Sequence, residues 1–153
     1  MRRRAYGDET WRLALSGDAA ELRRVADLLD GAGGEATYEA GRARAFALAV
    51  ERRGSAALEE LNEGWTEDWP FAPTYAADIA RVRLLAGDYA EALEALHLSL
   101  RGADRVDTDV ARLARECVRR DKRLLRRALV VATAGGTPWQ RLATAGSVLA
   151  ARF

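Results

Sequence analysis

The sequence predicts an all-α fold, and three features of its composition and spacing support this. Alanine occurs 32 times and leucine 20 times, whereas isoleucine occurs once and valine nine times, which is the bias of helices rather than strands. Only three prolines occur, and they lie at the ends of helical patterns. Apolar residues recur at steps of three and four, the spacing of an amphipathic helix, as in Ala92, Leu93, Leu96 and Leu100.

The length and charge of the chain predict one globular domain that needs neither disulfides nor metals. It has 153 residues, 49% of them hydrophobic, with 24 basic and 23 acidic residues. Cys117 is the only cysteine, which excludes an intramolecular disulfide and fits a reducing cytoplasm. Asp8 and Glu9 follow the basic residues 2–4 where a signal peptide would be apolar, so we expect no export signal. We also expect no membrane helix, because no apolar run reaches about 18 residues.

Helix breaks divide the chain at regular intervals. In segments 15–21 and 85–91 a helix ends at a glycine, and the aspartate that follows can cap the next helix. An unbroken helix over 108–133 would place an aspartate in the middle of its apolar stripe, which predicts a further break there. The predicted breaks lie near Gly17, Gly54, Gly87 and Asp121. The first three are separated by 54 − 17 = 37 and 87 − 54 = 33 residues.

These breaks define four helix-turn-helix units followed by one more helix. The units span about 6–31, 37–65, 73–102 and 107–134. Glycine or proline marks each connection between units. Thr137 caps the final helix, which has Pro138 at its first position and runs to about residue 152. Such a helix covers the open end of a helical stack.

The third unit resembles the tetratricopeptide repeat (TPR), a 34-residue pair of helices. The matching residues are Ala76, Ile79, Ala80 and Leu84 on the first helix and Gly87, Asp88, Tyr89, Ala92, Leu93, Leu96 and Ser99 on the second. When the second unit is aligned on Gly54, Glu59 stands where the family has alanine. Arg126 takes that place in the fourth unit. The resemblance implies a right-handed TPR-like α-solenoid with a C-terminal capping helix, and a protein-binding role.

Few residues could carry catalysis, so the chain is predicted to be non-enzymatic, without cofactor or metal. His97 is the only histidine and is expected on a helix surface, because a lone histidine lacks partners of its own type. Cys117 falls on an apolar stripe and is expected to be buried. Residues 31–36 fit the G-x-G-x-x-A dinucleotide-binding pattern, but that motif requires a preceding strand and a helix is predicted there.

The nearly neutral total charge hides a strong asymmetry. Residues 105–153 hold 11 basic and 4 acidic residues, whereas residues 1–104 hold 13 and 19. Arginine makes up 23 of the 24 basic residues, and its planar fork of donors suits carboxylates and phosphates. A series at helical spacing comprises Arg112, Arg115, Arg119, Arg123 and Arg126. These arginines form either a binding surface or simply a solvated face.

The TPR resemblance further implies a concave groove, lined by the first helix of each unit, that holds extended peptides. The arginines carried over to this groove are Arg44, Arg52, Arg81, Arg115 and Arg119. Such a groove would suit an acidic peptide or a C-terminal carboxylate. Asn62 is the only asparagine, so the asparagines that grip the peptide backbone in carboxylate-clamping relatives have no counterpart.

The connection 63–73 concentrates aromatic residues. It contains Trp65, Trp69 and Phe71 together with three acidic residues. These side chains either fold back over the junction of the second and third units or form an exposed aromatic anchor for a partner, in which case Trp65 and Trp69 are the candidates.

Two functions therefore compete at the level of sequence. The first is an adaptor that binds an acidic peptide or protein through an arginine-lined groove, or that forms a homo-oligomer through its acidic and basic ends. The alternative is a nucleic-acid-associated module, such as a component of a transcription regulator, which uses the basic region 112–127 on phosphates. The net charge of only +1 and the lack of a base-reading motif favour the adaptor. No membrane partner is expected.

Overall fold

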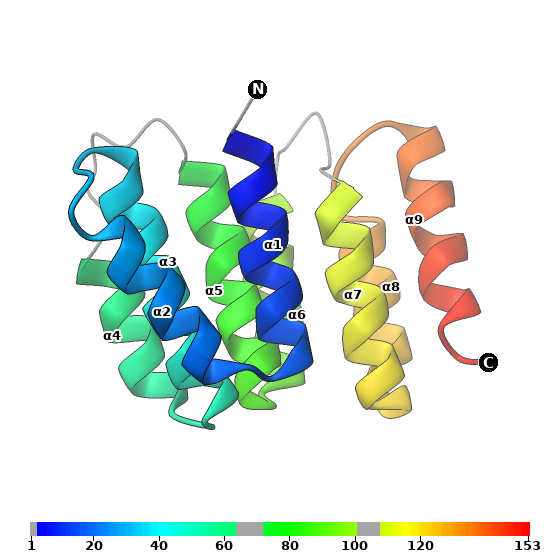
Figure 1. The fold of residues 1–153 in the computed structure, drawn as a ribbon. Helices are drawn as coiled ribbons and strands as arrows, with labels where there is room; N and C mark the ends of the chain where they lie inside the picture. The colour runs from blue at the N-terminus through cyan, green and yellow to red at the C-terminus, as the bar shows by residue number, and fades with distance from the viewer. Residues whose placement is uncertain (1–2, 64–71, 101–107) are drawn as a thin grey trace. The chain divides into compact units, whose positions relative to one another are not determined.

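The computed structural model describes residues 3–63, 72–100 and 108–153, and these residues form α-helices and one short 3-10 helix, without a strand. The all-α prediction is therefore confirmed for the described part of the chain (Figure 1). The helices are α1 (Arg3–Ser16), α2 (Ala19–Leu29), α3 (Glu35–Val50), α4 (Gly54–Glu63), α5 (Ala72–Ala86), α6 (Tyr89–Leu100), α7 (Thr108–Arg120), η1 (Lys122–Leu124), α8 (Leu125–Ala132) and α9 (Pro138–Ala150). None of the described helices is long and apolar enough to cross a membrane.

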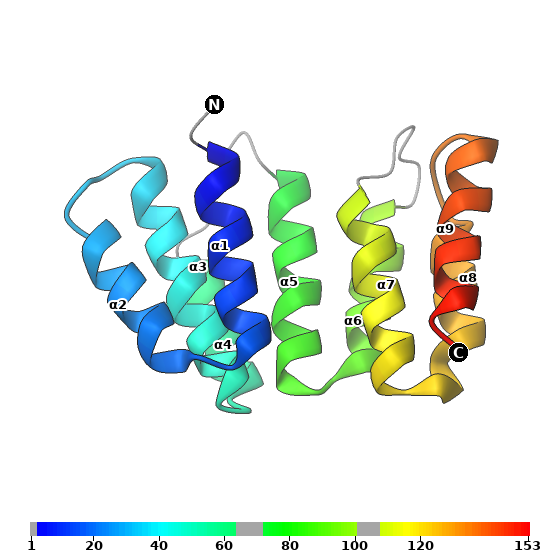
Figure 2. The same ribbon diagram turned by 45° about the vertical axis from the view of Figure 1, so that its right-hand side comes forward.

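The described residues divide into two compact units. The first contains 3–63 together with residues 85–87, and the second contains 72–84, 88–100 and 108–153. Within the first unit, α3 contacts α1, α2 and α4. Within the second unit, α6 contacts α7 and α8, and both α7 and α8 contact α9 (Figure 2). In the first unit α1 contacts both α2 and α3, and in the second unit α6 and α7 each contact the next helix and the next but one.

Three of the helix breaks share one turn geometry. Gly17, Arg52 and Gly87 adopt the left-handed backbone conformation, with φ of 78°, 62° and 94°. At each break the following residue donates its amide hydrogen to a carbonyl five residues back, the bond of a Schellman motif: Asp18 to Leu13, Arg53 to Leu48 and Asp88 to Arg83. The left-handed residues are evenly spaced, because 52 − 17 = 35 and 87 − 52 = 35.

This geometry corrects the alignment that was anchored on Gly54. Gly54 is the first residue of α4, and Arg52 occupies the position that glycine holds in the other two turns. Counting five residues from each turn residue then places Ala57 level with Ala92, and the mismatch predicted at Glu59 disappears. Ala57 is fully buried, whereas Glu59 is exposed.

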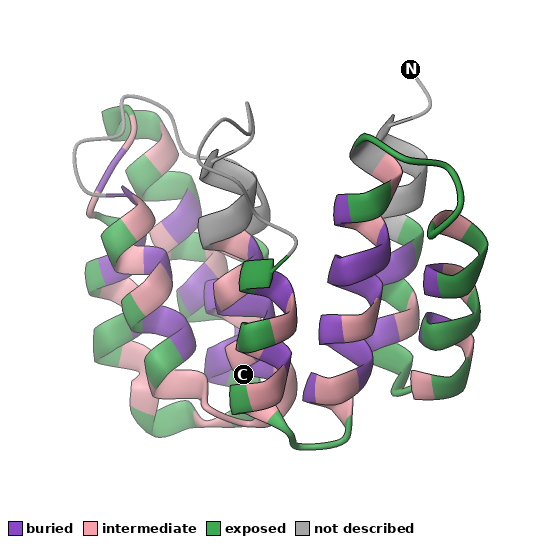
Figure 3. Cartoon of the chain, turned by 90° about the vertical axis from the view of Figure 1, so that its left-hand side faces the viewer, coloured by how far each residue is buried: buried purple, intermediate pink, exposed green. Residues whose placement is uncertain are grey.

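Buried positions follow the same 35-residue register through the first six helices. The first helix of each pair buries Thr10, Ala45 and Ala80, and one turn later Ala14, Ala49 and Leu84. The second helix buries Leu22, Ala57 and Ala92, and then Ala26, Leu61 and Leu96. Figure 3 colours the helices by burial, with exposed residues frequent on α2 and scarce on α3. The second helices α2 and α4 bury one side, whereas α3 is buried around most of its circumference, and small residues occupy many of the buried positions.

The fourth pair keeps the pattern with a shift. Asp121 accepts a hydrogen bond from the Arg123 amide at 3.0 Å and starts η1, as the predicted break requires. The short 3-10 turn moves the buried position of the second helix to Ala128, so Arg126 does not occupy the alanine position. Thr137 caps α9 and Pro138 is its first residue, as the sequence predicts, and Gln140 completes a capping box with Thr137.

The 35-residue register predicts that replacing its small buried residues with larger ones lowers the free energy of unfolding. Ala92→Leu and Ala57→Leu should each destabilise the protein by roughly 1–3 kcal/mol, because three added carbons must enter a closed contact between packed helices. Urea unfolding followed by circular dichroism measures this loss. The exposed Glu59→Leu is the control and should change the free energy of unfolding by less than about 0.5 kcal/mol. Neutral behaviour of both alanine variants would contradict the register.

The left-handed turn predicts a stabilising substitution. A residue with a Cβ pays about 1–2 kcal/mol in the left-handed region, which exceeds the added chain entropy of glycine. The Arg52 side chain is exposed and has no ion pair with a described residue, so little is lost on its removal. Arg52→Gly should therefore raise the free energy of unfolding by roughly 0.5–1 kcal/mol. Arg53→Gly, next to it with negative φ, should not stabilise; equal gains would contradict this explanation.

Candidate functional site

The two predicted groove arginines of the first unit differ in whether they form ion pairs with other side chains. Arg44 on α3 donates to Asp30 at 2.7 Å and to Glu60, and these hydrogen bonds raise the pKa of its guanidinium. Arg52 is exposed and its guanidinium lies beside Gly87, where a Cβ would collide with it. The charge of Arg44 is thus already matched by two carboxylates, and Arg52 is the more available of the two.

Arg81 is part of the interior of the second unit. It lies on α5 with 6% of its surface exposed and donates to Asp78 at 2.8 Å, and Asp78 is fully buried. Breaking a buried ion pair is strongly destabilising, because it leaves an uncompensated charge. In the 35-residue register Arg81 corresponds to the buried Phe46 and not to Arg44. Arg81 is therefore held in the interior by Asp78, and its role in a groove stays a prediction.

Arg115 and Arg119 lie one turn apart on α7, as the spacing predicts. Arg115 is half-buried and its Nε has no hydrogen-bond partner among the described residues. Arg119 is exposed and lies 3.8 Å from Glu116, which also accepts from Arg120 at 2.9 Å. Arg119 thus shares one acidic partner with a second arginine, which leaves positive charge in excess on this helix.

The strongest concentration of unbalanced charge lies in η1, α8 and α9. Residues 122–153 contain six basic residues and no aspartate or glutamate. All six are exposed: Lys122, Arg123, Arg126, Arg127, Arg141 and Arg152. No carboxylate in the described part of the chain forms an ion pair with any of them. We call these six residues the basic cluster; sequence reasoning found the charge excess but could not tell paired arginines from unpaired ones.

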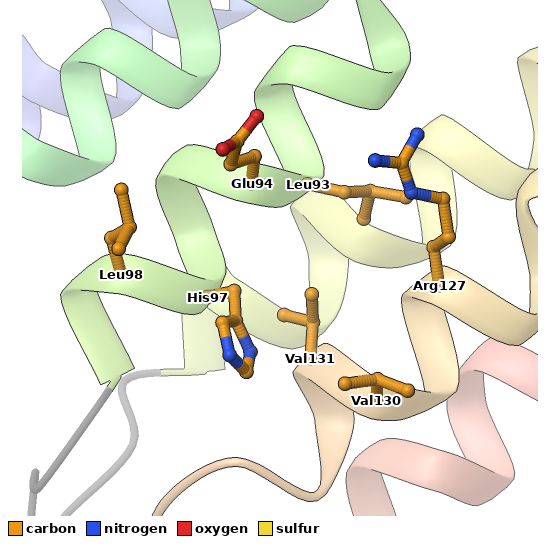
Figure 4. A pocket seen from close by; sticks show the side chains of 7 residues that line it. All are labelled: Leu93, Glu94, His97, Leu98, Arg127, Val130 and Val131. Carbon is orange, nitrogen blue, oxygen red and sulfur yellow. The ribbon is translucent and has the colours of Figure 1, made fainter.

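A pocket of about 280 Å³ lies between α6 and α8 (Figure 4). Its apolar lining comprises Leu93, Leu98, Val130 and Val131. Glu94, His97 and Arg127 add polar groups to the lining, and Arg127 belongs to the basic cluster. His97 is half-buried on the α6 surface, and its Nδ1 atom is buried without a hydrogen-bond partner among the described residues. Leu98 and Val130 are 60% and 57% exposed, so part of the apolar lining faces water.

The other candidates from the sequence have structural roles or lie outside the described residues. Cys117 is fully buried, and burial, with a smaller contribution from Glu116, raises the pKa of its thiol to about 12. The segment 31–34 follows helix α2, so the dinucleotide-binding pattern lacks the strand that it needs. The described residues contain no group of histidine, cysteine and carboxylate side chains that could hold a metal ion. Trp65 and Trp69 lie outside the described residues.

No protein-family model matches this chain, and neither a curated protein nor a solved structure matches it.

The environment of Cys117 predicts a thiol that does not react in the folded protein. At pH 8 the raised pKa leaves almost no thiolate, and the side chain is closed to reagents. Iodoacetamide should therefore leave the native protein unmodified over a period in which urea-unfolded protein reacts fully, as mass spectrometry would show. Fast modification of the native protein at pH 8 would contradict this prediction.

Proposed function

We propose that this chain is a TPR-like helical-repeat protein that acts as a non-enzymatic interaction module and binds an acidic segment of a partner protein. The observation that carries the proposal is the basic cluster, in which six exposed cations lie within 32 residues without an acidic residue between them. Cations that lack internal partners repel one another, and a carboxylate-rich partner relieves that repulsion. Five of the six are arginines, which bind carboxylates through two parallel hydrogen bonds.

The packing register supports the repeat architecture in this proposal. Left-handed turns and certain buried positions recur every 35 residues over three helix pairs, close to the length of a tetratricopeptide repeat. Helices in contact with both the next helix and the next but one are typical of stacked helical hairpins. A right-handed solenoid of four such pairs, with α9 as its capping helix, is the arrangement that we propose.

The pocket between α6 and α8 favours a protein segment as the ligand. Its exposed Leu98 and Val130 offer an apolar surface beside the positive charge of Arg127. A peptide that contains both apolar and acidic side chains could bury the former in the pocket and place the latter against the basic cluster. Interfaces combine an apolar centre with a charged rim in this way.

Nucleic acid is the competing ligand, because phosphates suit the same exposed arginines. Acidic peptide and duplex DNA are therefore compared directly. Three labelled peptides are compared by fluorescence anisotropy; they have equal length and the same apolar residues, and one is acidic, one neutral and one basic. We expect the acidic peptide to bind most tightly and the basic peptide most weakly. Duplex DNA should compete weakly with the acidic peptide. Tighter binding of DNA than of the acidic peptide would favour the nucleic-acid function.

Charge reversal in the basic cluster should weaken the acidic peptide. Arg126→Glu with Arg127→Glu removes two contacts that are worth about 1.5–3 kcal/mol each when they are formed, so the Kd should rise at least about tenfold. The same change of charge at Arg12 and Arg53, both exposed in the first unit, is the matched control and should change the Kd by less than about threefold. Equal losses would mean that bulk charge explains the attraction.

The predicted groove is tested in the same assay. Arg115→Glu with Arg119→Glu should also weaken the acidic peptide if α7 contributes to the binding surface. A Kd equal to that of the unmodified protein would restrict the binding surface to the basic cluster. Melting curves recorded by circular dichroism accompany each variant, because Arg115 is half-buried.

A further inference from the structure

Helix α9 presents an apolar face that no described residue covers. Its inner face buries Thr144 and Val148, and the helix contacts α7 and α8. Its outer face exposes Trp139, Leu142 and Leu149, of which 81%, 66% and 46% of the surface is open. The spacing from Trp139 through Leu142 and Gly146 to Leu149 is three, four and three residues, so these residues form one stripe along the helix. We call this stripe the outer face of α9.

Small residues fill the rest of the outer face. Ala143, Gly146 and Ala150 are exposed, and no charged residue interrupts the stripe. A Cβ added at Gly146 would meet nothing within 4 Å, and its φ is not in the left-handed region. Glycine in a helix interior is unfavourable relative to alanine, and nothing in the fold requires it here. A glycine at the centre of an exposed apolar stripe would allow a second helix to approach closely.

The charges beside the outer face are basic. Arg141 is exposed near the start of α9, and Arg152 is exposed just after its last residue, Ala150, so a cation lies beside each end of the stripe. The Lys122 ammonium group donates to the Arg152 carbonyl at 2.6 Å and adds a third cation near the end of the helix. The outer face of α9 is therefore an apolar stripe with a positive border.

We infer that the outer face of α9 docks an amphipathic helix of a partner protein, whose apolar stripe is bordered by acidic residues. This inference rests on the proposed function and specifies its partner. A helix surface has no free backbone donors or acceptors to pair with an extended peptide, whereas the apolar stripe of a second helix fits its ridges and grooves. The basic border selects carboxylates on that helix, because a basic helix would bring like charges together.

The same charges disfavour a second copy of this chain as the occupant. In an antiparallel pair of α9 helices centred on Gly146, Arg141 of one copy would face Ala151 of the other, with Arg152 beside it. Two arginines would thus meet at each end of the contact, without an acidic residue in 122–153 to compensate them.

A synthetic helical peptide tests the inference. The probe carries a leucine stripe with glutamates along one border, and a second probe has the same leucines with lysines in place of the glutamates. We expect the glutamate probe to bind the full chain in isothermal titration calorimetry. The double variant Leu142→Ala with Leu149→Ala should raise the Kd of this probe at least tenfold. Leu15→Ala with Leu28→Ala, which removes two exposed leucines of the first unit, is the matched control and should leave the Kd unchanged.

Gly146→Leu separates a docked helix from a lipid surface. The added side chain has open space and a better helix former replaces glycine, so the variant should fold and melt no lower than the unmodified protein. It should weaken the glutamate probe at least fivefold, because it fills the place of closest approach. Vesicles of phosphatidylcholine with phosphatidylserine should bind weakly. Vesicle binding that Gly146→Leu strengthens, with the probe unaffected, would overturn the inference in favour of a membrane.

Two further results would overturn the inference without affecting the proposed function. The first is an acidic peptide that loses affinity in Arg126→Glu with Arg127→Glu but not in the Leu142 and Leu149 variant. The second is that light scattering detects a dimer of the unmodified protein and only a monomer of the double variant Leu142→Ala with Leu149→Ala. Equal binding of the glutamate and lysine probes would also overturn the inference, because the basic border of α9 then selects nothing. The proposed function fails separately if the acidic, neutral and basic peptides bind equally well.

Discussion

The tight turn between paired helices fixes the register on which the rest of the packing depends. A left-handed residue followed by a Schellman hydrogen bond reverses the chain at residues 17, 52 and 87. The first helix of each pair therefore ends, and the second begins, at nearly equivalent positions. Five residues after each turn residue the second helix carries a fully buried side chain, which is Leu22, Ala57 or Ala92. Many helix contacts therefore follow from where the chain reverses.

The sequence predicts this architecture well where local chemistry determines it. Helix capping depends only on neighbouring residues, and Asp18, Asp121 and Thr137 cap helices as predicted. The predicted breaks depend on the same local signals, and each of them lies near a helix end. The second turn was misplaced by two residues because glycine is the expected left-handed residue, and Arg52 takes its place while Gly54 lies nearby in α4. That displacement put Glu59 at a buried position. Ala57, the buried residue, stands 35 residues from both Leu22 and Ala92, and this spacing is visible in the sequence.

The candidate site shows the opposite balance, because arginines that look alike in sequence have different partners in the fold. Arg44 meets carboxylates 14 and 16 residues away, and Arg81 is buried with an aspartate one turn earlier. Arg126 and Arg127, in contrast, form no ion pair with a carboxylate in the described part of the chain. Only the absence of acids from 122–153 could have been read from the sequence. The pocket beside His97 needs the contact of α6 with α8, although apolar Leu98 and Val130 outside the buried stripes were a signal.

Local preferences and the fold agree along most of α9, and they disagree on its outer face. The capping box and Pro138 start the helix well, and Val148 fits the packing against its neighbours, so this helix is built to be stable. Trp139, Leu142 and Gly146 do nothing for that stability, since two large apolar side chains face water and a glycine weakens the helix. Sites at which a sequence departs from its own fold are where function is expected. At the outer face the departures share one stripe and one positive border, which is the form that a helix-binding surface requires.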